Sequence, residues 1–423
     1  MLSKRFKATS LLCLVFVVTA SNAETLSNTE LTERLIKLEE QNQKLKNKLN
    51  GVNEKTGKRI AALNHTLSQQ SDRIRFNGFM SAMASKNNKN VDMFYESIGL
   101  DDHWSFSPDS IVGLQWDYTV ADKASATVQL VSKGSNSFET EAEWAYIKYQ
   151  FSDALSARAG RLRFPLYAKS ETFEVGFSYP WVRPPVEVYV ADVTSFEGVA
   201  LNYRDTAGNW LLEYQFVYGS VNDLLTKVRG DAGINIVANN GPINLSFIYI
   251  RSDKIIITSF ESLIDPSALE YIVASVGYDD GVWDILFEAA NAIPSRDSAI
   301  AGLYSGYLSI GYRINRFTPY LLQGGEDSEA DEEERASKIP AIALSPVDYR
   351  THSKNTALGL RYDINARVAL KFEASYFYDM DDRSRNRFKI VDLTAAIPTV
   401  IPGKKEELGS SATVLTMGVD LIF

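Results

Sequence analysis

The chain has 423 residues, a formal net charge of -9 and 45% hydrophobic residues, which is enough apolar surface for a large core or for the coat of a large barrel. The acidic balance argues against a nucleic-acid partner, because the neutralisation of phosphates requires a clustered excess of basic residues. The 21 Tyr, 21 Phe and 6 Trp favour strands, since aromatic side chains fit a pleated surface.

The first 23 residues predict a secretory signal peptide. Basic residues at positions 4, 5 and 7 precede an apolar run over 8–18, and the small residues at 21–23 are typical of a cleavage site. We therefore expect the mature chain to begin near Glu24. The apolar run is too short to cross a bilayer as a helix, and no later run approaches 18 apolar residues. A membrane form of this chain would therefore be a barrel.

Cysteine usage agrees with export of the chain. The single cysteine, Cys13, lies inside the apolar run, and the leucines around it differ from the small residues that precede a lipidated cysteine. This disfavours a lipoprotein. A closed barrel needs no disulfides, because its strands are hydrogen-bonded to one another around the whole ring.

Residues 24–72 predict a helix of coiled-coil type in the periplasm. Apolar residues recur at alternating steps of four and three, with Asn42 in one seam position; the seam comprises Leu31, Leu35, Leu38, Asn42, Leu45 and Leu49. Asn42 would set the register by placing a polar layer in the seam. The alternative is a lone amphipathic helix that packs on the barrel or crosses the periplasm. We favour oligomerisation, because an isolated helix with so narrow a stripe is marginal in water.

From about Arg73 the hydrophobic period changes from helical to two. In 212–218 and 368–376, apolar and aromatic residues alternate with polar or charged ones, as they do in the strands of membrane barrels. A soluble sandwich also alternates. We assume that the apolar face points outward and the small or polar face inward.

The connections between these segments alternate between short and long. Short turns are predicted near 121–122, 152–153, 205–209, 239–242, 279–281, 314–315 and 364–365, and the largest longer stretches are 86–109, 164–195, 253–269, 326–353 and 379–411. This asymmetry is typical of outer-membrane barrels, which have tight periplasmic turns and long external loops. The fold class we predict for 73–423 is all-β, a transmembrane barrel of about sixteen antiparallel strands.

The C-terminus predicts the closing strand. Leucine, methionine and valine alternate with small or polar residues from Leu415 onward, and the chain ends on Phe423. A terminal aromatic residue on such a strand resembles the signal that the barrel-assembly machinery of outer membranes reads. The alternative is an edge strand that ends in Phe by chance, which would leave an unpaired apolar edge.

The segment after the strand 155–160 is the candidate pore constriction. It is too apolar and aromatic to lie free in water, and its four prolines would keep it stiff. Folded into a barrel of this width, its charges would set the local field. The candidate constriction residues are Arg161, Arg163, Lys169, Glu171, Glu174, Tyr179, Trp181, Arg183 and Glu187.

The run Gly160-Arg161-Leu162-Arg163-Phe164-Pro165, which closes the fifth strand before a long third loop, resembles the trimeric porin superfamily. Its phosphate-selective branch and the branch with an N-terminal coiled coil are the most similar. In that family the third loop folds inward and narrows the pore, which implies this role for residues 164–195. The resemblance also implies a homotrimer in the outer membrane of a Gram-negative bacterium, in contact with lipid and lipopolysaccharide.

Charges expected on the pore wall are of mixed sign: Asp117, Arg158, Arg204, Glu213, Arg361, Lys371 and Glu373. A phosphate-selective pore would need a denser ladder of cations. The acidic run 326–334 is interpreted as a solvated external loop, or alternatively as a site for divalent cations that bridge lipopolysaccharide. No spacing matches an EF-hand, and we expect no cofactor.

Catalysis is disfavoured. The three histidines are His65, in the predicted helix, and His103 and His352, in predicted loops, and neither loop histidine has a nearby nucleophile signature. The leading hypothesis is passive diffusion of small hydrophilic solutes. One alternative is a channel selective for an anion or a dicarboxylate-like solute. Another is a structural or adhesive surface barrel that does not conduct.

Overall fold

The computed structural model describes residues 28–71, 73–89, 93–95, 98–189, 194–222, 226–257, 267–295, 302–329, 352–380, 391–392, 399–400 and 411–423. The chain divides into two compact units, Met1–Ser71 and Asp72–Phe423. The predicted signal peptide and most of the acidic run 326–334 lie outside the described residues.

The first unit contains the helix α1, Asn28–Ser71, which is 44 residues long. A helix is therefore present over most of the segment in which the sequence predicts one. Within the unit, the apolar side chains of Ile36, Leu38 and Leu45 are 54%, 56% and 64% exposed. Among the described residues, no helix is both long enough and apolar enough to cross a lipid bilayer.

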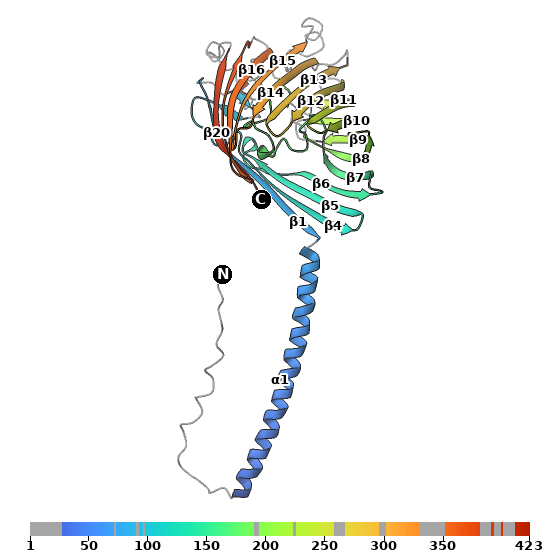
Figure 1. The fold of residues 1–423 in the computed structure, drawn as a ribbon, viewed down its shortest axis with the longest axis vertical. Coiled ribbons are helices and arrows are strands. Elements are labelled where there is room, and N and C mark those ends of the chain that lie inside the picture. Colours follow the sequence, from blue (N-terminus) through green and yellow to red (C-terminus); the bar gives the residue numbers. More distant parts are fainter. Residues whose placement is uncertain are drawn as a thin grey trace. The chain divides into compact units, whose positions relative to one another are not determined.

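The second unit is a closed antiparallel barrel in which the described strands number sixteen, as predicted (Figure 1). In chain order they are β1 (Ile74–Asn87), β4 (Ile111–Ala121), β5 (Ala124–Lys133), β6 (Thr140–Gln150), β7 (Leu155–Arg163), β8 (Ser195–Ala207), β9 (Trp210–Asn222), β10 (Thr226–Asn240), β11 (Ile243–Ile257), β12 (Ser267–Asp279), β13 (Trp283–Pro294), β14 (Gly302–Tyr312), β15 (Phe317–Glu329), β16 (His352–Asn365), β17 (Val368–Tyr378) and β20 (Ala412–Ile422).

Short elements lie within the connections. Two small hairpins were not predicted: β2 (Met93–Tyr95) pairs with β3 (Ile98–Leu100), and β18 (Val391–Asp392) pairs with β19 (Thr399–Val400). The single turns η1 and η2 span Gly134–Asn136 and Gly176–Ser178.

Short and long connections alternate around most of the barrel, as predicted; the exception is the connection between β9 and β10, which has three residues. The turns at 122–123, 208–209, 241–242 and 366–367 have only two residues, whereas 21 or more separate β1 from β4, β7 from β8, β15 from β16 and β17 from β20. We call the two rims the short-connection end and the long-connection end. The first residue of β1 and the last residue of β20 both lie at the short-connection end, because β20 closes the ring on β1.

The outer face of the barrel is apolar. Trp116, Phe216, Phe287 and Phe372 point away from the lumen and are 36% to 47% exposed. The assumed direction of the two faces is therefore correct. At the short-connection end, outward aromatic rings pair across neighbouring strands: Phe76 with Trp116, Trp283 with Tyr312 and Phe317 with Tyr362, with centroids 4.7 to 5.4 Å apart. Aromatic girdles of this kind mark membrane interfaces.

The inner face differs from the expectation of small or polar side chains. Polar residues do line it on β1, β17 and β20, but Val217, Ile248, Val273, Leu286 and Leu322 point inward from β9 to β15 and are at most 8% exposed. Part of the wall is apolar because the segment between β7 and β8 packs against it and excludes water, as described below.

Phe423 closes the ring. Its backbone N–H donates to the carbonyl of Gly78 at 2.9 Å, and the Gly78 N–H donates to the Phe423 carbonyl at 2.8 Å. The ring of Phe423 covers Gly78, where a Cβ atom would overlap it, and lies 6.2 Å from the ring of Phe76. Glycine at this position thus makes room for the terminal aromatic residue.

We expect the Gly78→Ala substitution to lower the free energy of unfolding by about 1–3 kcal/mol, the usual cost of overpacking, because the added methyl group would displace the Phe423 ring. The measurement is denaturant unfolding of the folded barrel in detergent. Gly277→Ala is the matched control, since a Cβ at Gly277 would meet its nearest atoms at 3.5 Å or more. Equal midpoints for the two variants would contradict this account of the closure.

Candidate functional site: the segment folded into the barrel

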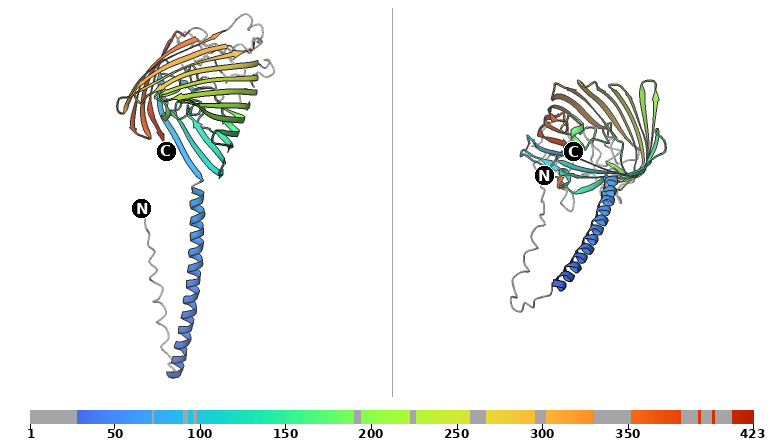
Figure 2. Two further views of the ribbon diagram at one scale, coloured as in Figure 1. Left: turned by 45° about the vertical axis from the view of Figure 1, so that its right-hand side comes forward. Right: turned by 60° about the horizontal axis from the view of Figure 1, so that its bottom comes forward.

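Residues 164–189, which we call the inner segment, lie inside the ring of strands (Figure 2, green). Their apolar side chains form one core with the inner wall, including Leu166, Tyr167, Tyr179, Trp181 and Val188 from the segment and Ile248, Val273, Leu286, Tyr307 and Leu322 from the wall. This burial explains why the segment is so aromatic, because each large ring removes much apolar surface from water.

A fully buried ion pair anchors the middle of the inner segment. The Lys371 Nζ on β17 lies 2.8 Å from the Asp420 Oδ2 on β20, and both side chains are 0% exposed. The same ammonium donates hydrogen bonds to the carbonyls of Gly176, at 2.6 Å, and Trp181. It also lies 4.6 Å from the centre of the Tyr179 ring. Lys371 therefore holds the segment rather than lining open water, as its predicted role on the pore wall would require.

Arg361 on β16 performs a similar function. Its Nη1 donates to the carbonyls of Phe177, at 2.7 Å, and Tyr179, at 3.0 Å, while its Nε donates to Asp363 at 2.9 Å. The guanidinium also lies 4.5 Å from the centre of the Phe177 ring. Two cations expected on the pore wall thus bind four carbonyl oxygens of the inner segment between Gly176 and Trp181.

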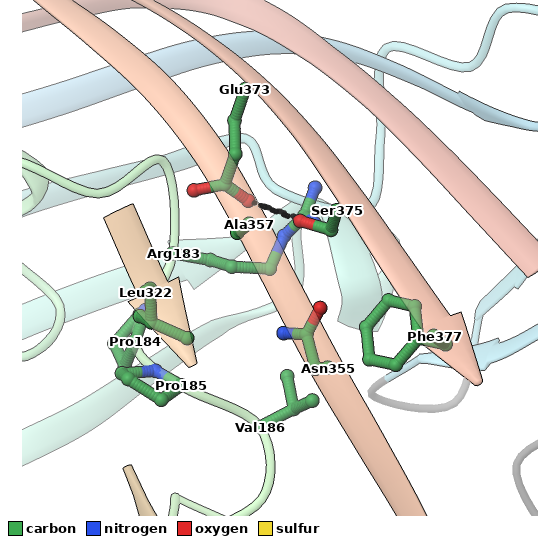
Figure 3. A pocket seen from close by; sticks show the side chains of 10 residues that line it. All are labelled: Arg183, Pro184, Pro185, Val186, Leu322, Asn355, Ala357, Glu373, Ser375 and Phe377. Atoms are coloured by element: carbon green, nitrogen blue, oxygen red, sulfur yellow. Dashed lines mark hydrogen bonds and ion pairs between the residues drawn. The ribbon is translucent and has the colours of Figure 1, made fainter. Parts of the chain in front are cut away.

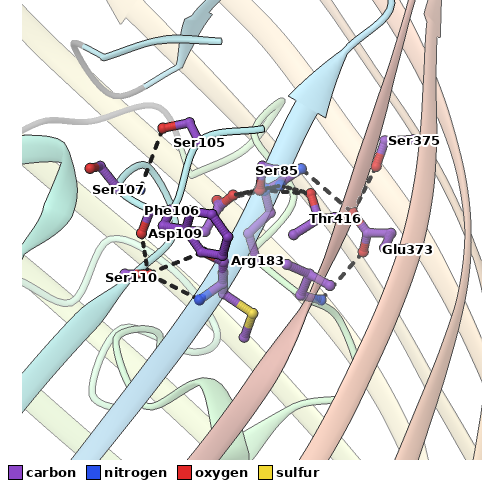
Figure 4. Close-up of polar contacts among 12 residues, drawn as sticks. Ser85, Ser105, Phe106, Ser107, Asp109, Ser110, Arg183, Glu373, Ser375 and Thr416 are labelled. Atoms are coloured by element: carbon purple, nitrogen blue, oxygen red, sulfur yellow. Dashed lines mark hydrogen bonds and ion pairs between the residues drawn. The ribbon is translucent and has the colours of Figure 1, made fainter. Parts of the chain in front are cut away.

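Arg183 ties the inner segment to the part of the ring where β17, β20, β1 and β4 meet (Figure 4). Its Nε and Nη2 donate to the two carboxylate oxygens of Asp109 at 2.8 and 2.7 Å, and its Nη2 also donates to Thr416 on β20. Its Nη1 lies 3.7 Å from Glu373 on β17. Asp109 was not singled out from the sequence, because it lies 74 positions from Arg183 and only folding brings the two together.

Glu373 is satisfied from several directions. It accepts hydrogen bonds from the Tyr320 hydroxyl at 2.6 Å, from Ser375 at 2.7 Å and from the backbone N–H of Val182 at 3.3 Å. A carboxylate buried in this way is stabilised by its donors. It therefore belongs to the support of the segment.

A second charged cluster holds the beginning of the inner segment. Arg163 donates to Glu174 and, at 3.3 Å, to Glu143, and Lys133 lies 2.8 Å from Glu174 and 3.1 Å from Glu143. All these groups except Lys133 are nearly excluded from solvent. Lys133, at the end of β5, was not among the residues chosen from the sequence.

Polar groups on β13 and β14 complete the attachment. The Glu288 carboxylate accepts from the N–H of Ala168 at 2.8 Å and from the hydroxyl of Tyr189 at 3.2 Å. Burial, together with the negative charge of Glu288, raises the pKa of Tyr189 well above its usual value, so that its hydroxyl remains a donor. Trp181 donates its indole N–H to Ser309 at 2.6 Å.

The predicted residues Arg158 and Arg204 face inner space that solvent reaches. Arg158 lies 3.2 Å from Glu171 of the inner segment, and Arg204 lies 3.1 Å from Glu213 with its side chain 65% exposed. Of the remaining three, Asp117 accepts from Thr127 and Gln115, Lys169 donates its backbone N–H to Tyr189, and Glu187 is fully buried beside Gly324.

Arg161 is the exception, and its expected place at the constriction is wrong. Its partner across β8 is Glu197, to which it donates a hydrogen bond. Glu197 precedes Gly198 and follows Phe196, which is buried in the inner core, so alternation along the strand places Glu197 on the outer face. The strand β7 continues to Arg163, beyond its predicted end at Gly160, and its pleat turns Arg161 outward.

A small pocket lies between the inner segment and the wall formed by β15 to β17 (Figure 3). Its cavity volume is about 10 Å³, and Arg183, Pro184, Val186, Asn355 and Phe377 are among its lining residues. The buried Oδ1 of Asn355 has no hydrogen-bond donor among the described residues. A cavity of this size has room for about one water molecule and not for a solute.

We expect Lys371→Met to destabilise the barrel by about 3–5 kcal/mol, because it leaves Asp420 buried without its counter-ion. Denaturant unfolding in detergent measures the loss, and Lys371→Met combined with Asp420→Asn should recover part of it. Arg204→Gln is the control, since exposed pairs contribute only about 0–1 kcal/mol. Equal losses for Lys371→Met and Arg204→Gln would argue against the anchoring role.

Comparison with known proteins gives a consistent result for the fold. No protein-family model matches the sequence, and no curated protein matches it. Among solved structures, an anion-selective porin from Comamonas acidovorans is 14% identical, with a TM-score of 0.54 over 83% of this chain and 99% of that chain. The outer membrane channel DcaP of Acinetobacter baumannii is 11% identical, with a TM-score of 0.53 over 83% and 97% of the two chains.

A trimer form of OmpT, an outer membrane protein of Vibrio cholerae, is 12% identical, with a TM-score of 0.51 over 83% of this chain and 99% of that chain. These identities are low, and the similarity therefore concerns the path of the backbone. The sixteen-stranded barrel of this chain has the fold of the outer-membrane porins.

Proposed function

We propose that the protein is an outer-membrane channel of a Gram-negative bacterium, which lets small hydrophilic solutes diffuse through a barrel narrowed by residues 164–195. The short-connection end and α1 would face the periplasm, and the long connections would face outward. The observation that carries the proposal is the attachment of the inner segment to inner-wall residues of β1, β5, β13, β14, β16, β17 and β20.

The outer surface supports a place in a membrane. An apolar band and a girdle of paired aromatic rings surround the barrel, and such a surface would be unfavourable in water. Phe423 would serve as the signal for the barrel-assembly machinery. No catalytic role is proposed.

A selective channel for anions is the second candidate function. Lys148 on β6 stands directly opposite Arg158 on β7, and Arg204 is close enough to add a third positive charge. Glu171 and Glu213 compensate only two of the three cations. A carboxylate or phosphate solute would be attracted to this part of the lumen. A surface barrel without conductance is the third candidate, and the extensive packing of the inner segment supports it.

Removing residues 164–195 should raise single-channel conductance several-fold in planar bilayers, because an unobstructed barrel of sixteen strands leaves an aqueous channel. The reversal potential in a salt gradient then separates the first two candidates, since a preference for anions in the intact protein supports the second. Unchanged conductance after deletion would refute the constriction. A folded protein that conducts neither before nor after the deletion would favour the surface barrel.

We also propose a homotrimer held in part by a coiled coil over residues 24–72. The exposure of Leu38 and Leu45 within the helical unit supports an apolar seam that a second helix would cover. The seam residues Leu31, Leu35, Leu38, Asn42, Leu45 and Leu49 would then face their equivalents in the partner chains.

On heating, the oligomer of a chain without residues 24–72 should dissociate at a lower temperature than the oligomer of the full mature chain. Light scattering coupled to size-exclusion chromatography would measure the oligomer in both. Asn42→Leu is an informative companion, because loss of the polar layer should stabilise the helices while relaxing their register. Equal oligomer stability with and without the segment would contradict the proposal.

A further inference from the structure

A row of polar side chains crosses five neighbouring strands on the outer face of the barrel. Each residue stands directly opposite the next in the strand register, and the row comprises Arg161, Glu197, Ser220, Arg229 and Lys254. The row lies near the long-connection end, since Arg161 is two residues from the end of β7 and Glu197 is two residues from the start of β8. We call it the polar row.

The outward direction of the row follows from burial. Phe196 and Val228 precede Glu197 and Arg229 and belong to the inner core, so their neighbours Glu197 and Arg229 point the other way. Ser252 and Ile255 bracket the pair Asp253 and Lys254 at a register irregularity in β11. Ser252 is buried and Ile255 packs on the inner core, whereas Asp253 and Lys254 are exposed. Gly230, with a φ of +70°, inserts an extra residue into β10 and keeps Arg229 on the outer face while Asp231 is buried.

The outer face becomes apolar within two register steps below the polar row. Two residues along each strand toward the short-connection end, which we call one register step, Val199 and Tyr218 are 52% and 63% exposed. On β11 and β12 the same step carries Arg251 and Glu270, which form an ion pair at 3.2 Å. Two steps below the row, the outward residues are Ala157, Leu201, Phe216, Ile234, Tyr249 and Ile272. The polar row therefore stands where an apolar band ends.

The charges along the row are unbalanced. Arg161 is neutralised by Glu197. The exposed carboxylate of Asp253, which precedes Lys254, lies 3.5 Å from Arg251 and forms its ion pair there. Arg229 and Lys254 remain as two cations at directly opposed positions. Like charges in this arrangement repel each other, because opposed side chains on antiparallel strands are only about 4.5–5.5 Å apart at Cβ. Within the described part of the chain, neither side chain has an ion pair. An anion between them would remove the repulsion.

We propose that Arg229 and Lys254 bind a phosphate group of an anionic lipid in the outer leaflet, whose acyl chains lie against the apolar band below. The inference rests on the proposed outer-membrane location, with the long connections outward. A phosphate has several acceptor oxygens, so one group can accept hydrogen bonds from the guanidinium and the ammonium at once. The lipid is favoured over free phosphate because only a lipid also uses the apolar surface of Tyr218 and Phe216.

The test uses the full mature protein folded in a neutral detergent, with lipid A as the probe and native mass spectrometry as the readout. Combined Arg229→Gln and Lys254→Gln should weaken lipid A binding about thirtyfold, because each cation near a membrane surface contributes about fivefold. The matched control replaces Lys123 and Arg367, two exposed cations in turns at the short-connection end, by Gln. This control has the same change in charge and should bind as the wild type does.

Each remaining outcome bears on the proposal. Arg229→Lys should keep most of the affinity, which would separate a lost charge from a damaged fold. Equal binding by the double variant and the wild type would overturn the proposal, and so would inorganic phosphate that displaces lipid A at comparable concentration, since the site would then belong to free phosphate. Conductance measured on the same samples tests the proposed channel separately. A protein that binds lipid A and does not conduct would contradict the proposed channel function and leave the lipid site standing.

Discussion

Closure of the sheet on itself is the constraint on which the other features of the barrel unit depend. With β1 paired to β20, the strands form a ring without an edge, so the backbone groups of each strand find partners on both sides. Successive side chains along each strand then point alternately to an outer face and to an enclosed inner face. Gly78 and Phe423 show how local the requirement is: the ring closes where a terminal aromatic side chain lies over a residue without a side chain.

The enclosed inner face and the inner segment bury each other's apolar side chains. Residues 164–189 could not expose Tyr167, Tyr179 and Trp181 to water, and the lumen offers an apolar wall on β9 to β15 that would otherwise be hydrated. The polar groups of the segment cannot be left unpaired there, because a buried group without a partner is costly. Lys371, Arg361 and Glu373 supply those partners, and each binds backbone groups of the segment. These three charged side chains therefore hold the inner segment in place within the lumen.

This use of charge affects the proposed transport. Cations committed to carbonyl oxygens contribute less to the field that a passing solute meets than do exposed groups. The charges left for solutes are those that solvent reaches, such as Arg204 and Glu213, together with Lys148 beside Arg158. The polar row on the outer face shows the same division between paired and available charges. Arg161 and Glu197 neutralise each other, while Arg229 and Lys254 remain available to an anion.

The sequence by itself determined the class of the fold. A period of two, alternating short and long connections and the alternating C-terminal strand were enough to predict a barrel of about sixteen strands, because these are properties of neighbouring residues and of strand length. The direction of the two faces was an assumption at that point, which the structure confirmed. It also identified the inner segment, since so many aromatic residues between prolines need burial. The tertiary structure alone decided which charges meet. Arg183 and Asp109 are 74 positions apart, Lys371 reaches the carbonyl of Gly176 across 195, and Arg161 changed faces because β7 continues three residues beyond its predicted end. Such pairings depend on the register around a closed ring, which no local pattern encodes.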